Sequence, residues 1–261
     1  MKIFDTHTHY DDAKFDALDG GDRKKTVKEV FDGGIGYITG MGVDIATSRM
    51  ALELAGSFEH FYAACGVHPE NINVGDDPDE VIAEIEKLLD DPKAVAVGEI
   101  GLDYYWEENP PRQVQKLWFE KQLVLAEKKK LPAVIHDREA HGDCFDIIRR
   151  HPGVRAVFHC YSGSPEMARQ LTELGCYISF TGNVTYKNSL KLWESIKAVP
   201  TDKIMIETDC PYMAPVPLRG KINDSRNLVY VVKKGAELLG MDEQKFIDLT
   251  TENALRFYGL Q

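Results

Sequence analysis

Short apolar runs alternate with longer amphipathic stretches along the whole chain, and this alternation limits the possible folds more than any other feature. Short runs that are apolar throughout are typical of strands covered on both faces, and amphipathic stretches are typical of the helices that cover them. The pattern predicts strands at residues 3–9, 37–41, 62–67, 94–100, 133–136, 156–159, 177–180 and 203–207. Eight strands, each followed by a helix, predict an α/β fold in which residues 1–261 form a single (β/α)8 TIM barrel.

The main alternative is a doubly wound open sheet, which is also built from alternating strands and helices. Such a sheet usually carries a glycine-rich phosphate loop after its first strand, whereas the first strand here ends in His7-Thr8-His9. A length of 261 residues, of which 43% are hydrophobic, suits one barrel of typical size. Proline residues that follow Asp77, Asn109 and Ser164 predict the beginnings of three of the helices.

Charge and cysteine content exclude several classes of protein. The net charge of −11 repels nucleic acid at long range, so an extended basic face for DNA is not expected. The five cysteines are scattered and form no Cys-x-x-Cys pair, which predicts reduced thiols. No apolar run approaches the roughly 18 residues of a membrane span, and the first residues lack the pattern of a signal peptide. We therefore expect a cytoplasmic monomer that does not bind membranes.

Histidines and acidic residues collect where the predicted strands end. In a (β/α)8 barrel, active-site groups come from the carboxyl ends of different strands. The residues at these ends are His7, His9, His68, Glu99, His136, His159, Glu207 and Asp209. A lone buried histidine or acid is more often a structural residue, and His7 with His9 could be surface histidines on a frayed terminal strand. Their convergence on one barrel mouth instead predicts a metal site, because unpaired charges crowded there would otherwise be costly.

The number of candidate ligands predicts two ions. Even four of these five imidazoles with two of the three carboxylates are too many for one tetrahedral catalytic ion, which normally has three protein ligands and an open position. A carboxylate shared by two ions about 3.5–4 Å apart is the arrangement of two-metal phosphoesterases. Glu99 is the expected bridge, because its strand stands between the two groups of histidines.

A set of motifs spread from the first strand to the last helix resembles the TatD family of metal-dependent deoxyribonucleases, within the amidohydrolase-type metal barrels. The motifs are "DTHTH", "GVHPE", "GEIGLDYY", "IHDREA", "FHCYSG", "TGNVTYKN", "IETDCPYMAP" and "RGKINDSRN". Two segments depart from the family pattern: Asp137 stands where many relatives have a small or neutral residue, and "RGKINDSRN" differs from the usual glycine-lysine-x-asparagine-x-proline.

The resemblance implies a role for each matching residue. One ion would be held by His7, His9, Glu99 and Asp209, and a second by Glu99, His136 and His159. His68 would hold substrate or water at the open face, and Asp209 would also accept a proton from the attacking water. Arg138 and Arg219 match positions that meet phosphate, and Tyr161 and Asn183 match positions that line the cleft.

Several further residues have two possible roles. Asp5 would share the inward face of its strand with His7 and His9 and could orient an imidazole, or it could be a buried aspartate bonded to the backbone. Glu207 alternates with Asp209 and could likewise orient an imidazole, or it could simply support the barrel. The aromatic residues 104–106 could stack nucleobases or serve ordinary packing.

The expected reaction is hydrolysis of a phosphodiester bond in DNA. Two divalent ions against two ligand carboxylates leave the pocket positive inside an acidic protein, which favours an anionic substrate. The resemblance implies exonucleolytic cleavage, with preference for single-stranded ends that can enter a barrel mouth. Histidine-rich ligation favours zinc, manganese, iron or nickel, whereas the family implies that magnesium supports nuclease activity.

Two other functions remain open at this point. An amidohydrolase or deacylase, including one that acts on aminoacyl-tRNA, would use the same activation of water. Many binuclear amidase-type barrels bridge their ions through a modified lysine on strand 4, where this chain has Glu99. A catalytically idle binding module would be expected to have lost ligands, and all six are present.

Overall fold

The computed structural model describes residues 2–260 and confirms the predicted barrel. Within these residues, eight parallel strands form one sheet in the order β1 to β8. A bridge between Thr8 and Cys210 joins the end of β1 to the chain after β8, and His9 N donates to Cys210 O at 2.8 Å. The strands are β1 Ile3–Thr8, β2 Ile35–Met41, β3 Phe61–Cys65, β4 Ala94–Asp103, β5 Ala133–Arg138, β6 Ala156–Phe158, β7 Tyr177–Phe180 and β8 Ile204–Ile206.

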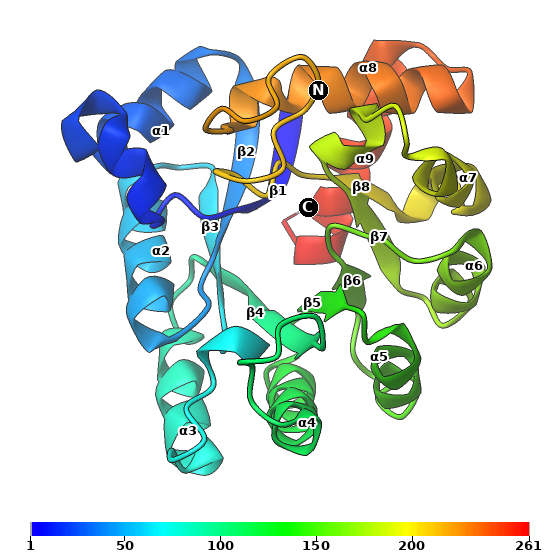
Figure 1. The fold of residues 1–261 in the computed structure, drawn as a ribbon. Coiled ribbons are helices and arrows are strands. Elements are labelled where there is room, and N and C mark those ends of the chain that lie inside the picture. Colours follow the sequence, from blue (N-terminus) through cyan, green and yellow to red (C-terminus); the bar gives the residue numbers. More distant parts are fainter. Residues whose placement is uncertain (1, 261) are drawn as a thin grey trace.

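The helices form an outer ring around the strands (Figure 1). One α-helix follows each strand: α1 Arg23–Asp32, α2 Ile45–Ser57, α3 Pro78–Leu88, α4 Arg112–Lys129, α5 His141–Ile148, α6 Pro165–Glu173, α7 Leu190–Ala198 and α8 Leu228–Leu239. A further helix, α9 Glu243–Tyr258, ends the fold. No helix within residues 2–260 is both long and apolar enough to cross a membrane.

Local chemistry explains where several helices begin. The Ser164 side chain accepts a hydrogen bond from Met167 N at the start of α6, and the Asp77 side chain accepts one from Asp79 N at the start of α3. The prediction for Asn109 was wrong, because α4 begins at Arg112 after two consecutive prolines. The Asn109 side-chain amide instead donates to Asp103 O at 3.3 Å, so it supports the loop after β4.

The amino ends of the strands, which we call the base of the barrel, are closed by α9. Phe257 and Tyr258 pack into a cluster with Phe4 and other buried residues of the strands. The Tyr258 hydroxyl donates to Thr6 O at 2.7 Å, which ties this helix to the first strand. The interior of the barrel at the base is therefore filled with apolar side chains, whereas the polar side chains of the interior lie at the carboxyl ends of the strands, which we call the mouth.

Candidate metal centre

The backbone of the mouth brings the ends of β1 and β8 together. Asp209 N donates to His7 O at 3.0 Å, so Asp209 lies beside the His-Thr-His segment. Asp209 adopts the left-handed conformation with φ 54°, and Cys160 does so with φ 42° directly after His159. Such conformations are unfavourable for residues other than glycine and cluster at functional sites. They turn the chain sharply after β8 and β6.

One oxygen of Glu99 faces the β1 histidines. Glu99 Oε2 lies 3.1 Å from His7 Nε2 and 3.4 Å from His9 Nε2. Asp209 Oδ1 closes this group at 3.7 Å from His7 Nε2 and 3.5 Å from His9 Nε2. These four side chains are the ones predicted to hold the first ion, and their donor atoms converge on one space.

The other oxygen of Glu99 faces a second group of histidines. Glu99 Oε1 lies 2.9 Å from His136 Nδ1 and 2.8 Å from His159 Nε2. The two ring nitrogens lie 3.3 Å from each other. Glu99 is 3% exposed, so its carboxylate stands between two groups of imidazoles with almost no contact with solvent.

Carboxylates outside the cluster fix how His159 and His136 present their rings. Glu207 Oε1 lies 3.2 Å from His159 Nδ1 and also accepts from Cys160 N at 2.7 Å. Asp103 Oδ2 lies 3.0 Å from His136 Nε2. A carboxylate on one ring nitrogen holds the proton there and leaves the lone pair of the other nitrogen for a metal.

Asp103 is the site residue that sequence reasoning missed. The predicted fourth strand ended at residue 100, whereas β4 continues to Asp103 and β5 continues to Arg138. Asp103 follows Glu99 by four residues, and positions of even spacing share a strand face. That spacing could have identified Asp103 as a residue on the same strand face as Glu99.

Burial and mutual interaction set the ionisation of the cluster. Burial raises the pKa of Glu99, but positive charge on His159 and His7 outweighs it and holds that pKa well below its usual range. Burial lowers the pKa of His9, but Asp209 and Glu99 raise it to about 10. Burial also lowers the pKa of His136, but Asp103 and Glu99 raise it to about 9. A buried carboxylate that stays ionised among imidazoles forms an environment suited to a cation.

His68 differs from the other histidines. Its Nδ1 accepts from Glu70 N at 3.2 Å, which leaves the proton on Nε2, 3.4 Å from Glu99 Oε1. Burial and the neighbouring His136 lower the pKa of His68 to about 4. At neutral pH its Nε2 is therefore a neutral hydrogen-bond donor at the edge of the cluster.

The donor set fits divalent ions. Three overlapping groups have donor atoms within 4.8 Å of one another: His7 with Glu99 and His159, His7 with His9 and Asp209, and His68 with Glu99 and His136. Imidazole nitrogens and carboxylate oxygens are the usual ligands of zinc, manganese, iron and nickel. Glu99 belongs to two of these groups and lies within 3.4 Å of both histidines of the third.

Of its two possible roles, Asp5 has the second, that of a buried aspartate bonded to the backbone. Its carboxylate accepts from Thr208 N at 2.8 Å and from Thr208 Oγ1 at 2.5 Å. His7 Nδ1 is buried with no hydrogen-bond partner among residues 2–260. A register shift between Asp5 and Thr8 interrupts the alternation of side chains, so Asp5 and His7 do not share one face. Asp5 supports the turn after β8.

The four residues expected around the cleft have different surroundings. The exposed guanidinium of Arg138 lies over the Tyr105 ring at 4.2 Å, and that of Arg219 lies over the Tyr186 ring at 4.4 Å. Asn183 Oδ1 is buried without a partner among the described residues. Tyr161 is only 3% exposed, and its hydroxyl donates to Ser164 O at 2.7 Å, so it supports the loop before α6.

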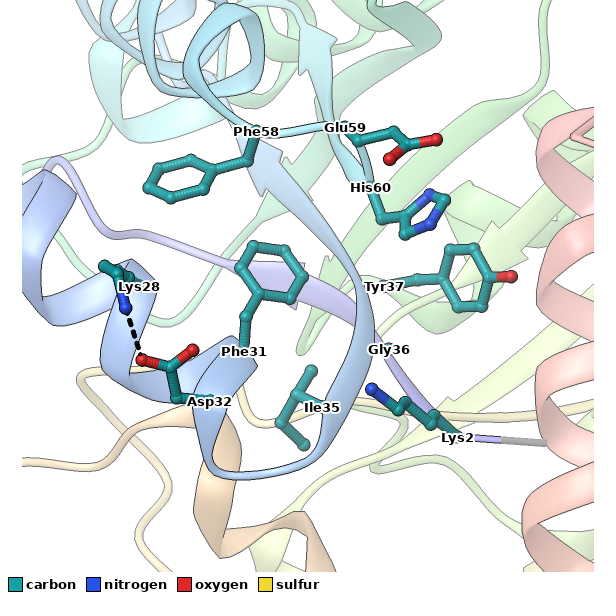
Figure 2. Close-up of a pocket in the computed structure, with 10 residues that line it drawn as sticks. All are labelled: Lys2, Lys28, Phe31, Asp32, Ile35, Gly36, Tyr37, Phe58, Glu59 and His60. Carbon is teal, nitrogen blue, oxygen red and sulfur yellow. Dashed lines mark hydrogen bonds and ion pairs between the residues drawn. The ribbon is translucent and has the colours of Figure 1, made fainter.

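A cavity of about 680 Å³ lies near the base, away from the histidine cluster. Figure 2 shows that Phe31, Phe58, Tyr37 and His60 surround it, with the ion pair between Lys28 and Asp32 at one side. None of the expected ligands lines this cavity. The expected ligands are thus gathered at the opposite end of the strands.

Comparisons with known proteins agree with this geometry. A family model described as TatD related DNase matches residues 4–259. An uncharacterized metal-dependent hydrolase of Bacillus subtilis, YabD, is 36% identical over 258 residues, with 98% of each chain covered. The uncharacterized metal-dependent hydrolase TatD of Mycobacterium tuberculosis is 32% identical over 266 residues, covering 99% of this chain and 98% of that one.

A solved structure is similar over the same extent. The crystal structure of the TatD homolog YJJV from Escherichia coli superimposes with a TM-score of 0.89 and 28% identity, covering 99% of this chain and 98% of that chain. The match therefore includes every strand that contributes to the cluster. This chain belongs to the TatD-related DNase family of metal-dependent hydrolases.

Proposed function

We propose that this protein hydrolyses phosphodiester bonds of DNA with two divalent ions, acting as an exonuclease that prefers single-stranded ends. The observation that supports this most is the position of Glu99. Its Oε2 faces His7 and its Oε1 faces His159 at 2.8 Å, as expected of a carboxylate shared by two ions. The match to a DNase family directs the proposal to DNA.

The residues around Glu99 would hold the two ions. His7, His9 and Asp209 complete one set of donors, and His136 with His159 completes the other. When bound, divalent ions such as magnesium, manganese, zinc, iron or nickel would polarise the phosphoryl oxygens and acidify the attacking water. Their positive charge favours an anionic substrate in a protein whose net charge is −11.

The chain itself would supply proton transfer and orientation. Asp209 is 15% exposed, more than the 3% of Glu99, so its carboxylate can accept a proton from water at the open side. The Nε2–H of His68 can donate to a phosphoryl oxygen. Arg138 stacks on Tyr105 and keeps its guanidinium edges available for a charge-assisted contact with phosphate. Arg219 lies at the side of the mouth formed after β8.

A substrate panel on metal-defined protein tests the proposal. Protein would be chelated, refilled with single metals and assayed on linear single-stranded DNA, duplex DNA, RNA and simple esters. We expect the fastest hydrolysis on linear single strands and none on a circular single strand, which has no end. Ester or amide hydrolysis without DNA cleavage would assign the protein to the acyl hydrolases instead. No hydrolysis under any metal would indicate a binding module.

A further inference from the structure

The exposed tyrosine and tryptophan rings of residues 2–260 lie around the mouth. Among residues 2–260, the aromatic side chains that are largely exposed are Tyr105, Trp106 and Tyr212, at 50%, 44% and 42%. Tyr105 and Trp106 follow β4, and Tyr212 follows β8. Exposure of this size is not explained by core packing, and rings beside cationic groups are typical of surfaces that bind single-stranded nucleic acid.

The two sets of rings lie on opposite sides of the mouth. In a ring of strands ordered β1 to β8, β4 and β8 face each other across the barrel. Glu99 on β4 and Asp209 after β8 lie between these two sides and are joined through His7 and His9. A chain that crosses from one side to the other must therefore pass over the proposed metal centre.

The side after β4 carries an aromatic platform, made of Tyr105 and Trp106. The two rings meet edge to face with centroids 4.7 Å apart, and Arg138 lies over Tyr105. Tyr105 N donates to Asp103 Oδ1 at 2.9 Å, while the other oxygen of Asp103 holds His136. The platform is thus anchored to a carboxylate that also orients a proposed metal ligand, which fixes its position relative to the proposed metal centre.

The side after β8 carries a cationic cavity of about 370 Å³. Lys14, Arg219 and Lys221 line it with Tyr212, and no carboxylate is among its described lining residues. The Lys14 ammonium lies 3.7 Å from the Tyr212 ring centroid. By contrast, the exposed acids Glu107 and Glu108 directly follow the platform. The β8 side also has Asp12, which accepts from the Tyr212 hydroxyl, and the β4 side also has Arg138 over Tyr105. Three cations against one carboxylate leave the β8 side positive, whereas one cation against two carboxylates leaves the outer edge of the β4 side negative, so phosphates are favoured at the β8 side.

From this asymmetry we propose a path for the substrate, which rests on the proposed function. The terminal nucleobase of a single DNA strand stacks on the face of Trp106, and Tyr105 supports that ring edge to face. The terminal phosphodiester lies over the metal centre, and the remaining strand leaves through the cavity lined by Lys14, Arg219 and Lys221, which binds its backbone phosphates. The platform recognises a neutral aromatic base without reading its sequence.

The test of the platform compares oligonucleotides that differ only in the terminal base. Two single strands have either an ordinary nucleoside or an abasic deoxyribose at the end from which cleavage proceeds. Trp106→Ala should lower kcat/KM on the ordinary strand about 5- to 100-fold, as expected for loss of one stacked base. On the abasic strand the variant and the wild type should react at equal rates. Leu117→Ala, which removes a similarly exposed apolar side chain from α4, is the control and should react like wild type on both strands.

The test of the cavity measures binding without cleavage. In chelator, anisotropy of a labelled single strand is followed as salt rises, for Lys221→Ala and for the control Lys245→Ala on α9. Lys221→Ala should weaken binding of a long strand and reduce the salt slope by about 0.7, the value for one phosphate of a single strand. Lys245→Ala should leave the slope unchanged.

The outcomes separate this inference from the proposed function. Wild-type protein that cleaves neither strand would overturn both. Wild-type protein that cleaves DNA, with Trp106→Ala unchanged or equally impaired on both strands, would overturn the platform alone. Equal salt slopes for Lys221→Ala and Lys245→Ala would overturn the assignment of the cavity.

Discussion

The mouth and the base of the barrel are two ends of the same strands. Buried polar side chains fill the mouth, whereas buried apolar side chains fill the base. At the mouth, Glu99 and His7 are charged or polar, buried and within 3.1 Å of each other. At the base, Phe4 packs against the rings of Tyr37 and Tyr258 at 5.3 and 5.7 Å. Apolar packing at one end provides the stability that allows an unfavourable concentration of polar groups at the other.

The backbone is also less favourable at the mouth than at the base. Asp209 and Cys160 hold left-handed conformations beside the proposed ligands, each of which costs on the order of 1–3 kcal/mol. At the base, the Tyr258 hydroxyl and the Thr251 hydroxyl donate to main-chain oxygens of β1 and Lys2 at 2.7 and 3.0 Å. We therefore expect substitutions at the mouth to alter function more than stability. Substitutions at the base should alter stability more than function.

The largest functional effect is expected at Glu99. Glu99→Gln preserves the shape of the side chain but removes the charge shared by the two groups of imidazoles. Hydrolysis of DNA should fall by a factor on the order of 10³ or more, since loss of metal assistance is worth several kcal/mol. Steady-state rates at saturating metal check this, with circular dichroism to confirm folding. A loss no larger than that of His159→Ala would show that Glu99 does not serve both ions.

The largest effect on stability is expected at the base. Phe257 is fully buried and lies 5.2 Å from the Tyr177 ring. Phe257→Ala should reduce the free energy of unfolding by about 3–5 kcal/mol through lost burial and a remaining cavity. Urea denaturation measures this, and the folded fraction should retain its metal content and turnover. Loss of metal before unfolding would contradict the separation of the two ends.

A smaller effect is expected from the carboxylates that orient the ligands. Glu207→Gln leaves an acceptor for His159 Nδ1 but removes the charge, so metal affinity should fall about 10- to 100-fold. Asp5→Asn is the matched control, because Asp5 is equally buried but contacts Thr208. Calorimetric titration of chelated protein with one metal distinguishes them. Equal losses of affinity in both variants would indicate a general effect of buried charge.

The smallest effect is expected at the rim. Arg138→Ala should leave metal content intact and lower DNA hydrolysis on the order of tenfold, the value for losing one charge-assisted contact of about 1.5–3 kcal/mol. Hydrolysis of an uncharged ester, if present, should change far less. Rates on both substrates with metal-replete protein check the prediction. Unchanged DNA cleavage would leave Arg138 with only its stacking contact to Tyr105.

The strands and the ligand cluster could be predicted because both follow from local rules. Short apolar runs identify buried strands, and metal-binding residue types at their carboxyl ends meet in any barrel of this topology. The predicted strand at 177–180 agrees with β7 to the residue. The order of the strands alone was enough to predict that His7, His136 and Glu99 lie close together.

The remaining features depend on three-dimensional detail that spacing does not encode. The register shift between Asp5 and Thr8 rotated Asp5 away from the rings, although strict alternation placed it beside them. The added length of β4 brought Asp103 to His136. The stacking of Arg138 on Tyr105 depends on how the loops after two strands pack, which composition does not reveal.

The central claim is that the mouth holds two divalent ions joined by Glu99. It is tested most directly by elemental analysis of protein that has been chelated, refilled with excess metal and desalted. We expect close to two ions per chain in the wild type and fewer in Glu99→Gln, with Asp5→Asn unchanged. No bound metal in the wild type, or only one ion per chain at saturating concentration, would contradict the two-metal centre.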